Sequence, residues 1–504
     1  AEMVRPYGAW IDALRALAAA EIPPPLRAEL APLLPELGAA ASTGDRTRLF
    51  DAVVALLASL ARAGRPLALI LDDVHWLDES SAALLHYVVR AAGGGHVLLA
   101  AAARPGELAD HRAVLRVVRA LARDGRLCRI ELGPLDADAI AALVGADDAA
   151  RVFADSGGNP LFALELAAAG PNLGDSADTL DELIDDRLDR LGARARDVLP
   201  FCAALGRSFG VELVAGAAAL PPVDFVAAVE ELERHGVLRA ATAGNYDFVH
   251  DLVRAAAYRR LSEPRRRLVH QHLAEALGRL PDRDGALAGD RAHHAALAGD
   301  LVGAARACVA AGGHCLRVFA QAEAEKMAAR GLSYLERLPN DVRLEVEIPL
   351  YHVAIFGDNA RAATRELDTQ ISRAVLQAES AGLTKLAQDG MHLLAMLQWR
   401  SDALAGARDW SIASAEKARA GDPATAALGL ATASRCLLFL GRETPRACAM
   451  ALEAEALAKQ HALTLPEVPW ALGLAYHFSG EVERSLAAHA EALALNAPRQ
   501  DHWA

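Results

Sequence analysis

Residues 67–78 read LALILDDVHWLD, five apolar residues that lead directly into two aspartates. A continuous apolar run of this length is typical of a strand buried on both faces, as in a parallel sheet. Asp72 and Asp73 then fall at the carboxyl end of the strand, the edge at which open α/β sheets bind ligands. The alternative is structural, because Asp72, Asp73 or Asp78 can cap the helix that follows.

Two further apolar runs, 97–103 and 127–132, extend this pattern along the chain. Each follows a stretch with helical spacing, 81–92 in the first case and 113–123 in the second. Strands that alternate with helices predict a parallel sheet with helices on its faces. The N-terminal part is therefore expected to be α/β.

The composition limits the class of protein further. The 504 residues include 52 Lys and Arg against 65 Asp and Glu, so the formal net charge is −13. An acidic chain argues against a large nucleic-acid surface, because phosphate binding needs clustered basic charge. Six cysteines without a CxxC pair exclude a disulfide scaffold and a zinc ribbon. No apolar run approaches the ~20 residues of a membrane span, so we expect a soluble, cytoplasmic protein without membrane contact.

Several motifs occur in a characteristic order. DDVHWLD (72–78) is followed by a strand ending in Arg104-Pro105, by SGGNPLF (156–162) and by FVHDLVRAAAYRRL (248–261), while VRPYGAWIDALRAL (4–17) opens the chain. The series resembles the STAND signal-transduction NTPases, and among them the large ATP-binding regulators of the LuxR class. It is also similar to modules found behind some bacterial adenylate cyclase domains. The resemblance covers most of the chain and implies an AAA-type ATPase core.

The resemblance implies roles for three residues at the expected sheet edge. Asp72 would orient a hydrated Mg²⁺, and Asp73 would polarise the attacking water. Arg104 would be the sensor that reads the γ-phosphate at the end of the next strand. The alternative for Arg104 is a solvated loop charge beside Pro105.

The resemblance also assigns nucleotide contacts further along the chain. Gly158, Asn159 and Pro160 would form the turn that touches the adenine, and His250 would contact the β-phosphate. The structural alternatives are a helix-start turn with Pro at an early helical position, and a core or capping histidine.

The phosphate-cradling motif GxxxxGK[ST] does not occur in these residues, and the only lysines are Lys326, Lys385, Lys417 and Lys459. By the resemblance, the first strand and its P-loop precede the opening segment, so we expect a fragment in which strands 67–71 and 97–103 pair with each other. The intact protein would use ATP or ADP with Mg²⁺, whereas this chain alone is expected to bind no nucleotide strongly and to hydrolyse it poorly.

The middle of the chain predicts short helices and one hairpin. The hairpin would turn at Ala243-Gly244-Asn245, and with the helices it suggests a winged helix. The expected recognition helix, 223–235, carries Asp224 and three glutamates, which argues against DNA reading. GRSFG at 206–210 matches the nucleophile-elbow pattern but follows a helical run, so a helix C-cap turn is the better explanation of both glycines.

The C-terminal third reads as helix pairs. Residues 471–476 (ALGLAY), with Gly480, Ala492 and Pro498, approximate the tetratricopeptide pattern. Stacked pairs of this kind bury one continuous core and leave a concave surface for partners. Cys308 and Cys315, near His293, His294 and His314, could suggest a metal site, but a buried seam with solvated histidines is the expectation.

These observations predict a multidomain α/β plus all-α protein: a P-loop NTPase core lacking its first strand (1–135), a helical lid (136–178), a winged-helix-like domain (179–285) and TPR-like repeats (286–504). The expected function is an ATP-dependent signal-transduction or transcriptional regulator, with a protein or small-molecule inducer on the repeats. Self-association is possible, and DNA would be bound only through a domain outside this chain. The alternatives are a nucleotide-dead protein-binding scaffold and the regulatory tail of a nucleotide cyclase.

Overall fold

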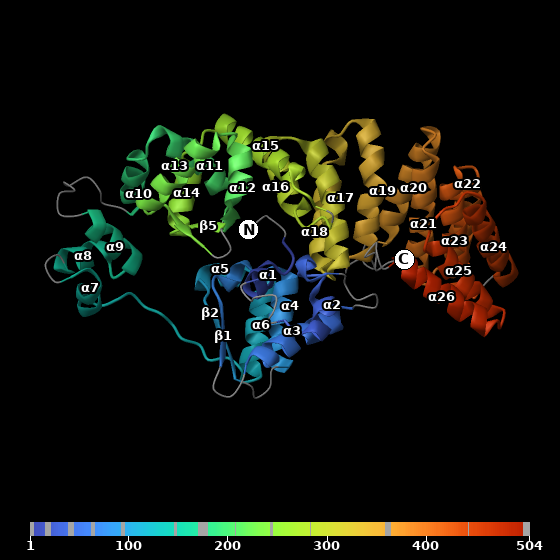
Figure 1. The fold of residues 1–504 in the computed structure, drawn as a ribbon, viewed down its shortest axis with the longest axis horizontal. Coiled ribbons are helices and arrows are strands. Elements are labelled where there is room, and N and C mark those ends of the chain that lie inside the picture. The colour runs from blue at the N-terminus through green and yellow to red at the C-terminus, as the bar shows by residue number, and fades with distance from the viewer. Residues whose placement is uncertain are drawn as a thin grey trace. The chain divides into compact units, whose positions relative to one another are not determined.

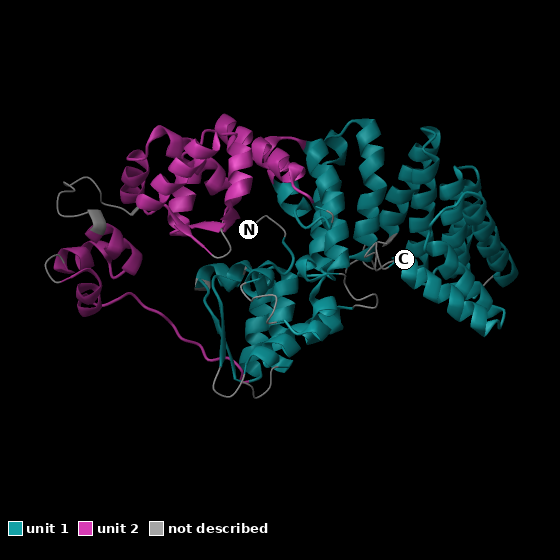
Figure 2. Cartoon of the chain, viewed as in Figure 1, with its two compact units in different colours: residues 1–124, 282–293, 301–504 teal, residues 125–281, 294–300 magenta. Residues whose placement is uncertain are grey.

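A computed structural model gives the fold (Figure 1). It describes residues 5–15, 22–38, 45–61, 66–91, 96–145, 149–169, 180–206, 208–241, 245–282, 284–357, 364–441 and 443–496. Ala243 and Gly244 of the expected hairpin turn, Arg207 and Pro498 lie outside these residues. The chain divides into two compact units (Figure 2). Unit 1 is 1–124, 282–293 and 301–504, and unit 2 is 125–281 and 294–300.

Unit 1 begins with a small α/β assembly. Its strands are β1 (Leu67–Leu71) and β2 (Val97–Ala101), which pair in parallel with Leu67 opposite Val97 and Leu71 opposite Ala101. The expected pairing of these two strands with each other is confirmed. The helices of this part are α1 (Gly8–Arg15), α2 (Pro24–Leu30), α3 (Arg46–Leu60), α4 (Glu79–Ala91), α5 (Pro105–Asp110) and α6 (Arg112–Arg123).

The helices bury one face of the β1–β2 pair. Tyr7 and Trp10 of the opening segment are fully buried in the same core, and the Trp10 Nε1 donates to the Ser81 carbonyl at 3.1 Å. The opposite face is open, because Ile70 is 73% exposed and Leu98 is 64% exposed. The expectation that both faces of this sheet are buried is therefore wrong for the described residues.

The third expected strand does not form. Residues 127–132 contain no regular element, and Leu127, Ile130 and Leu132 are exposed. An apolar run becomes a strand only where a neighbouring strand satisfies its backbone N–H and C=O groups. No such partner pairs with this segment among the described residues, so its apolar composition misled the prediction.

Unit 2 contains short helices and a three-stranded antiparallel sheet. The sheet has the order β3 (Phe209–Gly210), β5 (Asn245–Phe248), β4 (Leu238–Ala240), with Leu238 of β4 opposite Phe248 of β5. Gly206, at φ 90°, ends α11 (Ala193–Leu205) as expected, but Gly210 precedes α12 (Val211–Ala218) at its N-terminus rather than closing a helix. The bounds are α7 (Ala137–Val144), α8 (Ala149–Ser156), α9 (Pro160–Ala169), α10 (Leu180–Asp189), α11 (Ala193–Leu205), β3 (Phe209–Gly210), α12 (Val211–Ala218), α13 (Pro222–Arg234), β4 (Leu238–Ala240), β5 (Asn245–Phe248), α14 (Asp251–Arg259) and α15 (Glu263–Arg279).

The rest of unit 1 is a run of helix pairs, which gives the predicted α-solenoid. Exposed ion pairs join alternate helices, as between Arg408 and Glu443 and between Arg419 and Glu453. The helices are α16 (Ala288–Ala298), which continues into unit 2, α17 (Leu301–Arg317), α18 (Gln321–Leu332), α19 (Asn340–Phe356), α20 (Thr364–Ser380), α21 (Thr384–Arg400), α22 (Leu404–Arg419), α23 (Pro423–Phe439), α24 (Thr444–Gln460), α25 (Glu467–Phe478) and α26 (Val482–Asn496).

Two sequence expectations for this region concern buried groups. Cys308 and Cys315 are buried in the helix packing, as expected for a seam. His294 is fully buried, so the expectation of solvated histidines is wrong at that position. Over the described residues, no cluster of histidine, cysteine and acidic side chains could hold a metal ion, and no helix is long and apolar enough to cross a membrane.

Candidate functional site

The two aspartates that follow β1 lie at its carboxyl end. Asp72 is exposed, and its Oδ1 accepts a hydrogen bond from the Asp73 backbone N at 2.9 Å. Asp73 has φ 50° and ψ 47°, a left-handed conformation that aspartate tolerates better than most residues. Immediately after it the Val74 backbone N donates to the Ala102 carbonyl at 2.9 Å, which fixes the turn against the end of β2.

The helix-cap alternative applies to Asp78 instead. Its Oδ1 accepts from the Ser81 backbone N at 2.8 Å and from the Tyr7 backbone N at 3.2 Å, so Asp78 caps α4. Burial, together with the nearby carboxylate of Glu323, raises the pKa of Asp78 to about 6. The Asp73 side chain makes no cap bond to the short 3₁₀ turn Val74–Trp76 that it precedes.

Arg104 lies at the end of the neighbouring strand, where α5 begins. Its Nη1 donates to Glu107 Oε1 at 3.0 Å, and its backbone N donates to His75 Nδ1 at 3.4 Å. The guanidinium is about half exposed, so a ligand could reach it. Arg104 is therefore not only a solvated loop charge, because it also contacts Glu107 and His75.

Sequence reasoning missed a group of side chains between these two strand ends. His75 is buried, and its Nε2 lies 3.1 Å from Glu107 Oε2 and 3.7 Å from Asp73 Oδ1. The Trp76 Nε1 donates to the same Glu107 oxygen at 3.1 Å. Because Nδ1 accepts the Arg104 amide, a neutral His75 carries its proton on Nε2, facing the carboxylates.

Glu107 is the centre of this group. The hydrogen bond from Arg104, and further contacts with Trp76 and His75, hold the pKa of the Glu107 carboxyl below its ordinary value. The available signal in the sequence was the position of His75 two residues after the acid pair and of Glu107 three residues after Arg104. We call Asp72, Asp73, His75, Arg104 and Glu107 the strand-end cluster.

The Gly158-Asn159-Pro160 turn starts α9, as its structural alternative predicts. Gly158 has φ 78°, and a Cβ there would lie 2.3 Å from the Leu135 carbonyl oxygen, so only glycine fits. The Asn159 Oδ1 accepts from the Leu161 backbone N at 3.0 Å, and Pro160 is the first helical residue. The contact with adenine stays a prediction.

His250 precedes α14 and makes no side-chain cap bond to it. Burial lowers the pKa of His250, while the carboxylate of Glu165 opposes this shift and Arg239 and Arg187 add to it. A neutral imidazole is therefore favoured in this structure, and its contact with a β-phosphate stays a prediction.

The predicted site residues are distributed over both units. Asp72, Asp73 and Arg104 come together in unit 1, in the strand-end cluster. Gly158, Asn159, Pro160 and His250 belong to unit 2, in which the turn and the histidine lie on different elements.

Comparisons with known proteins agree with the N-terminal part of this description. The family model of the AAA ATPase domain matches residues 1–100, which contain Asp72, Asp73 and His75 and end before Arg104. This match confirms an AAA-type ATPase resemblance for that region. No curated protein matches the sequence.

Two solved structures are similar to the chain. One is the crystal structure of the Signal Transduction ATPase with Numerous Domains (STAND) protein with a tetratricopeptide repeat sensor from Pyrococcus horikoshii. It is 14% identical with a TM-score of 0.47, and the match covers 99% of this chain and 78% of that chain. The other is BtubC (BKLC) from P. vanneervenii, 14% identical with a TM-score of 0.32, over 46% of this chain and 92% of that one.

Proposed function

From the AAA ATPase domain that residues 1–100 match, we propose that this chain belongs to an ATP-dependent signalling regulator. One observation carries the proposal: inside the matched region, two acids stand at the carboxyl end of a parallel strand, and Arg104, just beyond that region, lies at the end of the neighbouring strand. Open α/β sheets bind their ligands at this edge. The helical repeats would supply the sensor surface.

Asp72 is the residue that would hold Mg²⁺ through water. Its carboxylate is exposed and engaged with a backbone amide, so it fits a hydrated cation that keeps most of its own waters. The cation would supply charge neutralisation for the phosphates of a bound nucleotide. Asp73, held in its left-handed turn, would orient a water molecule beside it.

The strand-end cluster suggests how a bound phosphate would be sensed. Arg104 donates to Glu107, and Glu107 also faces the buried His75 and the Trp76 indole. A phosphate that attracted the Arg104 guanidinium would weaken its bond to Glu107. The Glu107 carboxylate would then keep only its contacts with His75 and Trp76, and these two residues lie on the turn directly after the two acids.

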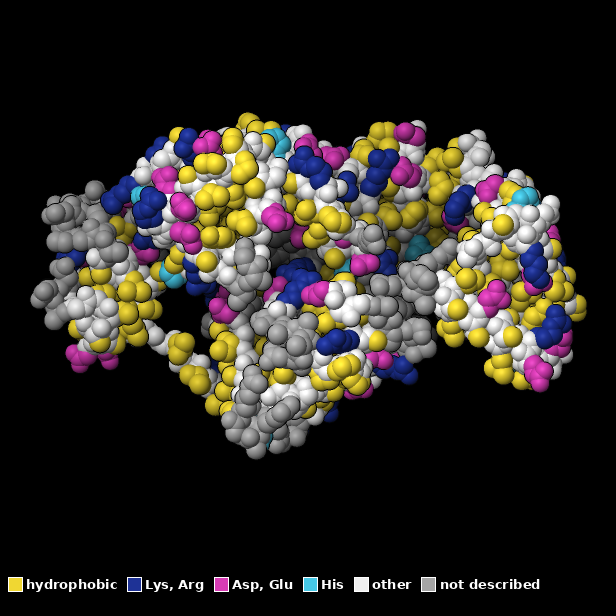
Figure 3. Space-filling view, viewed as in Figure 1, with side chains coloured by type: hydrophobic (Ala, Val, Ile, Leu, Met, Phe, Trp, Pro, Cys, Tyr) yellow, Lys and Arg dark blue, Asp and Glu magenta, His cyan; other side chains and the backbone are white. Residues whose placement is uncertain are grey.

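The C-terminal helices would receive the input signal. Exposed apolar side chains occur there, among them Phe439, Phe478 and Leu486, which are 57%, 47% and 68% exposed. Figure 3 shows apolar side chains interspersed with charged ones on this part of the displayed surface. A protein inducer fits such a surface, although a small molecule or self-association would also use it. Transcriptional output of the LuxR type, through a DNA-binding domain outside these residues, belongs to the same proposal.

Hydrogen exchange would test the nucleotide switch. Because these residues contain no GxxxxGK[ST] motif and strong nucleotide binding is not expected, the full chain is compared with and without Mg-ATP at millimolar concentration, as wild type and as Asp72→Asn. ATP should slow exchange in the peptides around 72–78 and 104–107 of the wild type. Asp72→Asn should lose at least about 80% of that protection, because it removes the carboxylate charge that attracts the hydrated cation.

The control variant is Asp45→Asn, which changes an exposed helix-capping aspartate away from the strand ends. Protection equal to wild type is expected there. No protection at millimolar ATP would contradict the proposal and favour a protein-binding scaffold. Protection retained in Asp72→Asn would place the nucleotide elsewhere.

A further inference from the structure

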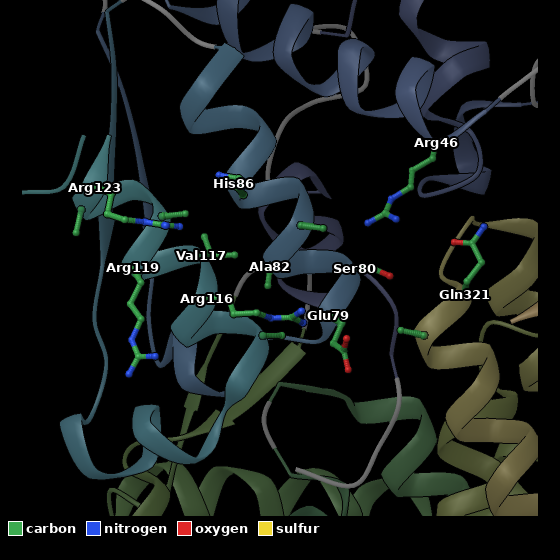
Figure 4. Close-up of a pocket in the computed structure, with 15 residues that line it drawn as sticks. Arg46, Glu79, Ser80, Ala82, His86, Arg116, Val117, Arg119, Arg123 and Gln321 are labelled. Atoms are coloured by element: carbon green, nitrogen blue, oxygen red, sulfur yellow. The ribbon is translucent and has the colours of Figure 1, made fainter. Parts of the chain in front are cut away.

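A cavity of about 840 Å³ lies in unit 1, and no residue of the strand-end cluster lines it (Figure 4). Four segments line it: the start of α3, α4 between Glu79 and His86, α6 and the start of α18. Arginines dominate its polar lining. We call Arg46, Arg116, Arg119 and Arg123, together with His86, the arginine pocket.

The positive charge of the arginine pocket is not balanced by the protein. Among the described residues, Arg116, Arg119 and Arg123 form no ion pair. The acid in the lining, Glu79, is already paired with Lys326, whose Nζ lies 3.0 Å from Glu79 Oε1. Gathering like charges costs free energy unless a counter-charge is bound, and this chain has a net charge of −13.

Two buried polar atoms of the pocket also lack partners. Arg46 Nε and His86 Nε2 are inaccessible to solvent and make no hydrogen bond in the described structure. A buried donor without an acceptor is unfavourable by roughly 1–3 kcal/mol, so native proteins satisfy most such groups. An acceptor-rich ligand would satisfy the Arg46 Nε–H group, and also His86 Nε2 in the tautomer that carries its proton there.

The sequence of α6 builds the basic wall. Its arginines at 116, 119 and 123 follow a spacing of three and four that places them on one helical face, whereas Arg112, one turn earlier, does not line the cavity. Val114 and Leu121 occupy the buried face and attach the helix to the core. Arg116 and Arg123 extend from α6 toward α4 in Figure 4.

Apart from the basic residues and from Glu79, Ser80 and Gln321, the lining is apolar. Ala82 and Ala83 of α4 and Val117 of α6 contribute methyl groups between the charged side chains. A ligand that suits this surface carries negative charge at one end and an apolar or aromatic body at the other. The volume falls in the range of small-molecule pockets.

We propose that the arginine pocket binds an organic phosphate with two or more negative charges. Guanidinium groups form paired, charge-assisted hydrogen bonds with phosphate oxygens, and several arginines on one wall favour a diphosphate over a carboxylate. The lining of this pocket shares no residue with the strand-end cluster, where the nucleotide is proposed to bind. Its contact with Gln321 and Ala322 of α18 places the ligand where the α/β part of unit 1 meets the solenoid.

The test is a calorimetric titration of the full chain with inorganic pyrophosphate, in EDTA so that no Mg²⁺-dependent site contributes. Arg116→Gln should weaken binding about tenfold, since it removes one charged hydrogen-bonding group, and the double variant with Arg123→Gln should weaken it further. Arg112→Gln is the matched control. It is exposed on the same helix one turn earlier, lies outside the lining, and should change the Kd less than twofold.

Two further titrations define the ligand. Phenyl phosphate should bind more tightly than inorganic phosphate if the apolar lining is used. Asp72→Asn should leave the pyrophosphate Kd unchanged, so that failure of the nucleotide proposal and failure of this one are distinguishable. The proposal is overturned if pyrophosphate does not bind, if Arg116→Gln binds it as wild type does, or if only a single-stranded oligonucleotide binds.

Discussion

Asp78 shows how one residue combines a local and a distant role. It caps α4 through the Ser81 amide, and it also lies close to the carboxylate of Glu323, 245 positions later in the sequence. Capping the helix requires an oxygen acceptor on residue 78 but no negative charge. Burial and the carboxylate of Glu323 both make the charged form of Asp78 less favourable. The residue therefore stabilises the helix at the cost of an unfavourable ionisation near neutral pH.

Asp78→Asn should stabilise the protein relative to wild type more at pH 7.5 than at pH 4.5. The native pKa, about 6, lies above the ordinary 3.8. The folded state therefore holds an extra proton between these values, and the contribution of this carboxyl to stability falls as the pH rises through that window. The difference between the two pH values should reach about 1–3 kcal/mol in urea unfolding.

The comparison for this prediction is Asp45→Asn, the exposed cap of α3, which accepts from the Arg48 amide at 2.8 Å. Because Asp45 is exposed to solvent, its substitution should show a smaller difference between the two pH values than Asp78→Asn does. If Asp78→Asn has equal effects at pH 4.5 and 7.5, the carboxyl of Asp78 does not carry the elevated pKa.

The sequence predicted only those site residues that directly follow an apolar run of strand length. Asp72 and Asp73 were found because an apolar run of fixed length ends at them, and Arg104 because the next run does. His75 and Glu107 were not found, since nothing local shows that residues 32 positions apart face each other. Whether Asp78 or its neighbours capped the helix depended on where α4 begins, which sequence patterns locate only to within a few residues.

At the scale of elements, small residues set the distance between the solenoid helices. Gly429 of α23 faces Ala418 of α22, and a Cβ added to Gly429 would lie 2.3 Å from the Ala418 Cβ. A Cβ is fixed to its backbone, so this contact cannot be relieved by a side-chain rotation. The two helices would have to separate.

Gly429→Ala should therefore destabilise the protein by about 1–3 kcal/mol, the usual cost of overpacking. Gly216→Ala is the matched substitution, because Gly216 lies within α12 and nothing surrounds the added methyl group. That change should be neutral or stabilising by up to about 1 kcal/mol through helix propensity. Thermal unfolding of both variants measures the contrast, and equal effects would refute the packing argument.

The fold was predictable wherever the pattern was long and periodic. Four elements lie within a few residues of their expected ranges: β1, β2 and the helices near 79–91 and 112–123. In each of them the apolar residues recur at a regular spacing, and the pattern ends at a definite residue. The run 127–132 resembles them in composition but forms no strand. The exposure of the sheet face at Ile70 and Leu98 could not be predicted from the sequence either. The apolar character of a strand does not show whether another layer of the fold covers it.

At the scale of the whole chain, Glu323 connects the solenoid to the α/β part of unit 1. It is buried on α18, and its two oxygens accept from the Glu79 amide at 2.9 Å and the Ser80 hydroxyl at 2.6 Å. The Glu79 amide and the Ser80 amide, which also faces Glu323 Oε1 at 3.4 Å, are free donors of the first turn of α4, and such donors need acceptors when they are buried. One side chain thus completes a helix that lies more than 240 residues earlier.

Glu323→Ala should reduce the free energy of unfolding by about 2–4 kcal/mol, because it leaves buried donors without an acceptor. Ser80→Ala should cost less, and the double variant should show coupling of at least about 0.5 kcal/mol. Glu336→Ala, on an exposed turn of the same region, should fall within about 0.5 kcal/mol of wild type. Additive effects of Glu323→Ala and Ser80→Ala would contradict a direct link.

The same link has a consequence for synthesis on the ribosome. The amides of Glu79 and Ser80 leave the exit tunnel long before their acceptor, since residue 323 follows Glu79 by 244 positions. At translation rates of roughly 5–20 residues per second, the first turn of α4 waits on the order of 10–50 s for its partner. During that interval the nascent chain must keep an unfinished helix end hydrated or shielded. Pauses in translation before codon 323 should therefore increase its capture by chaperones.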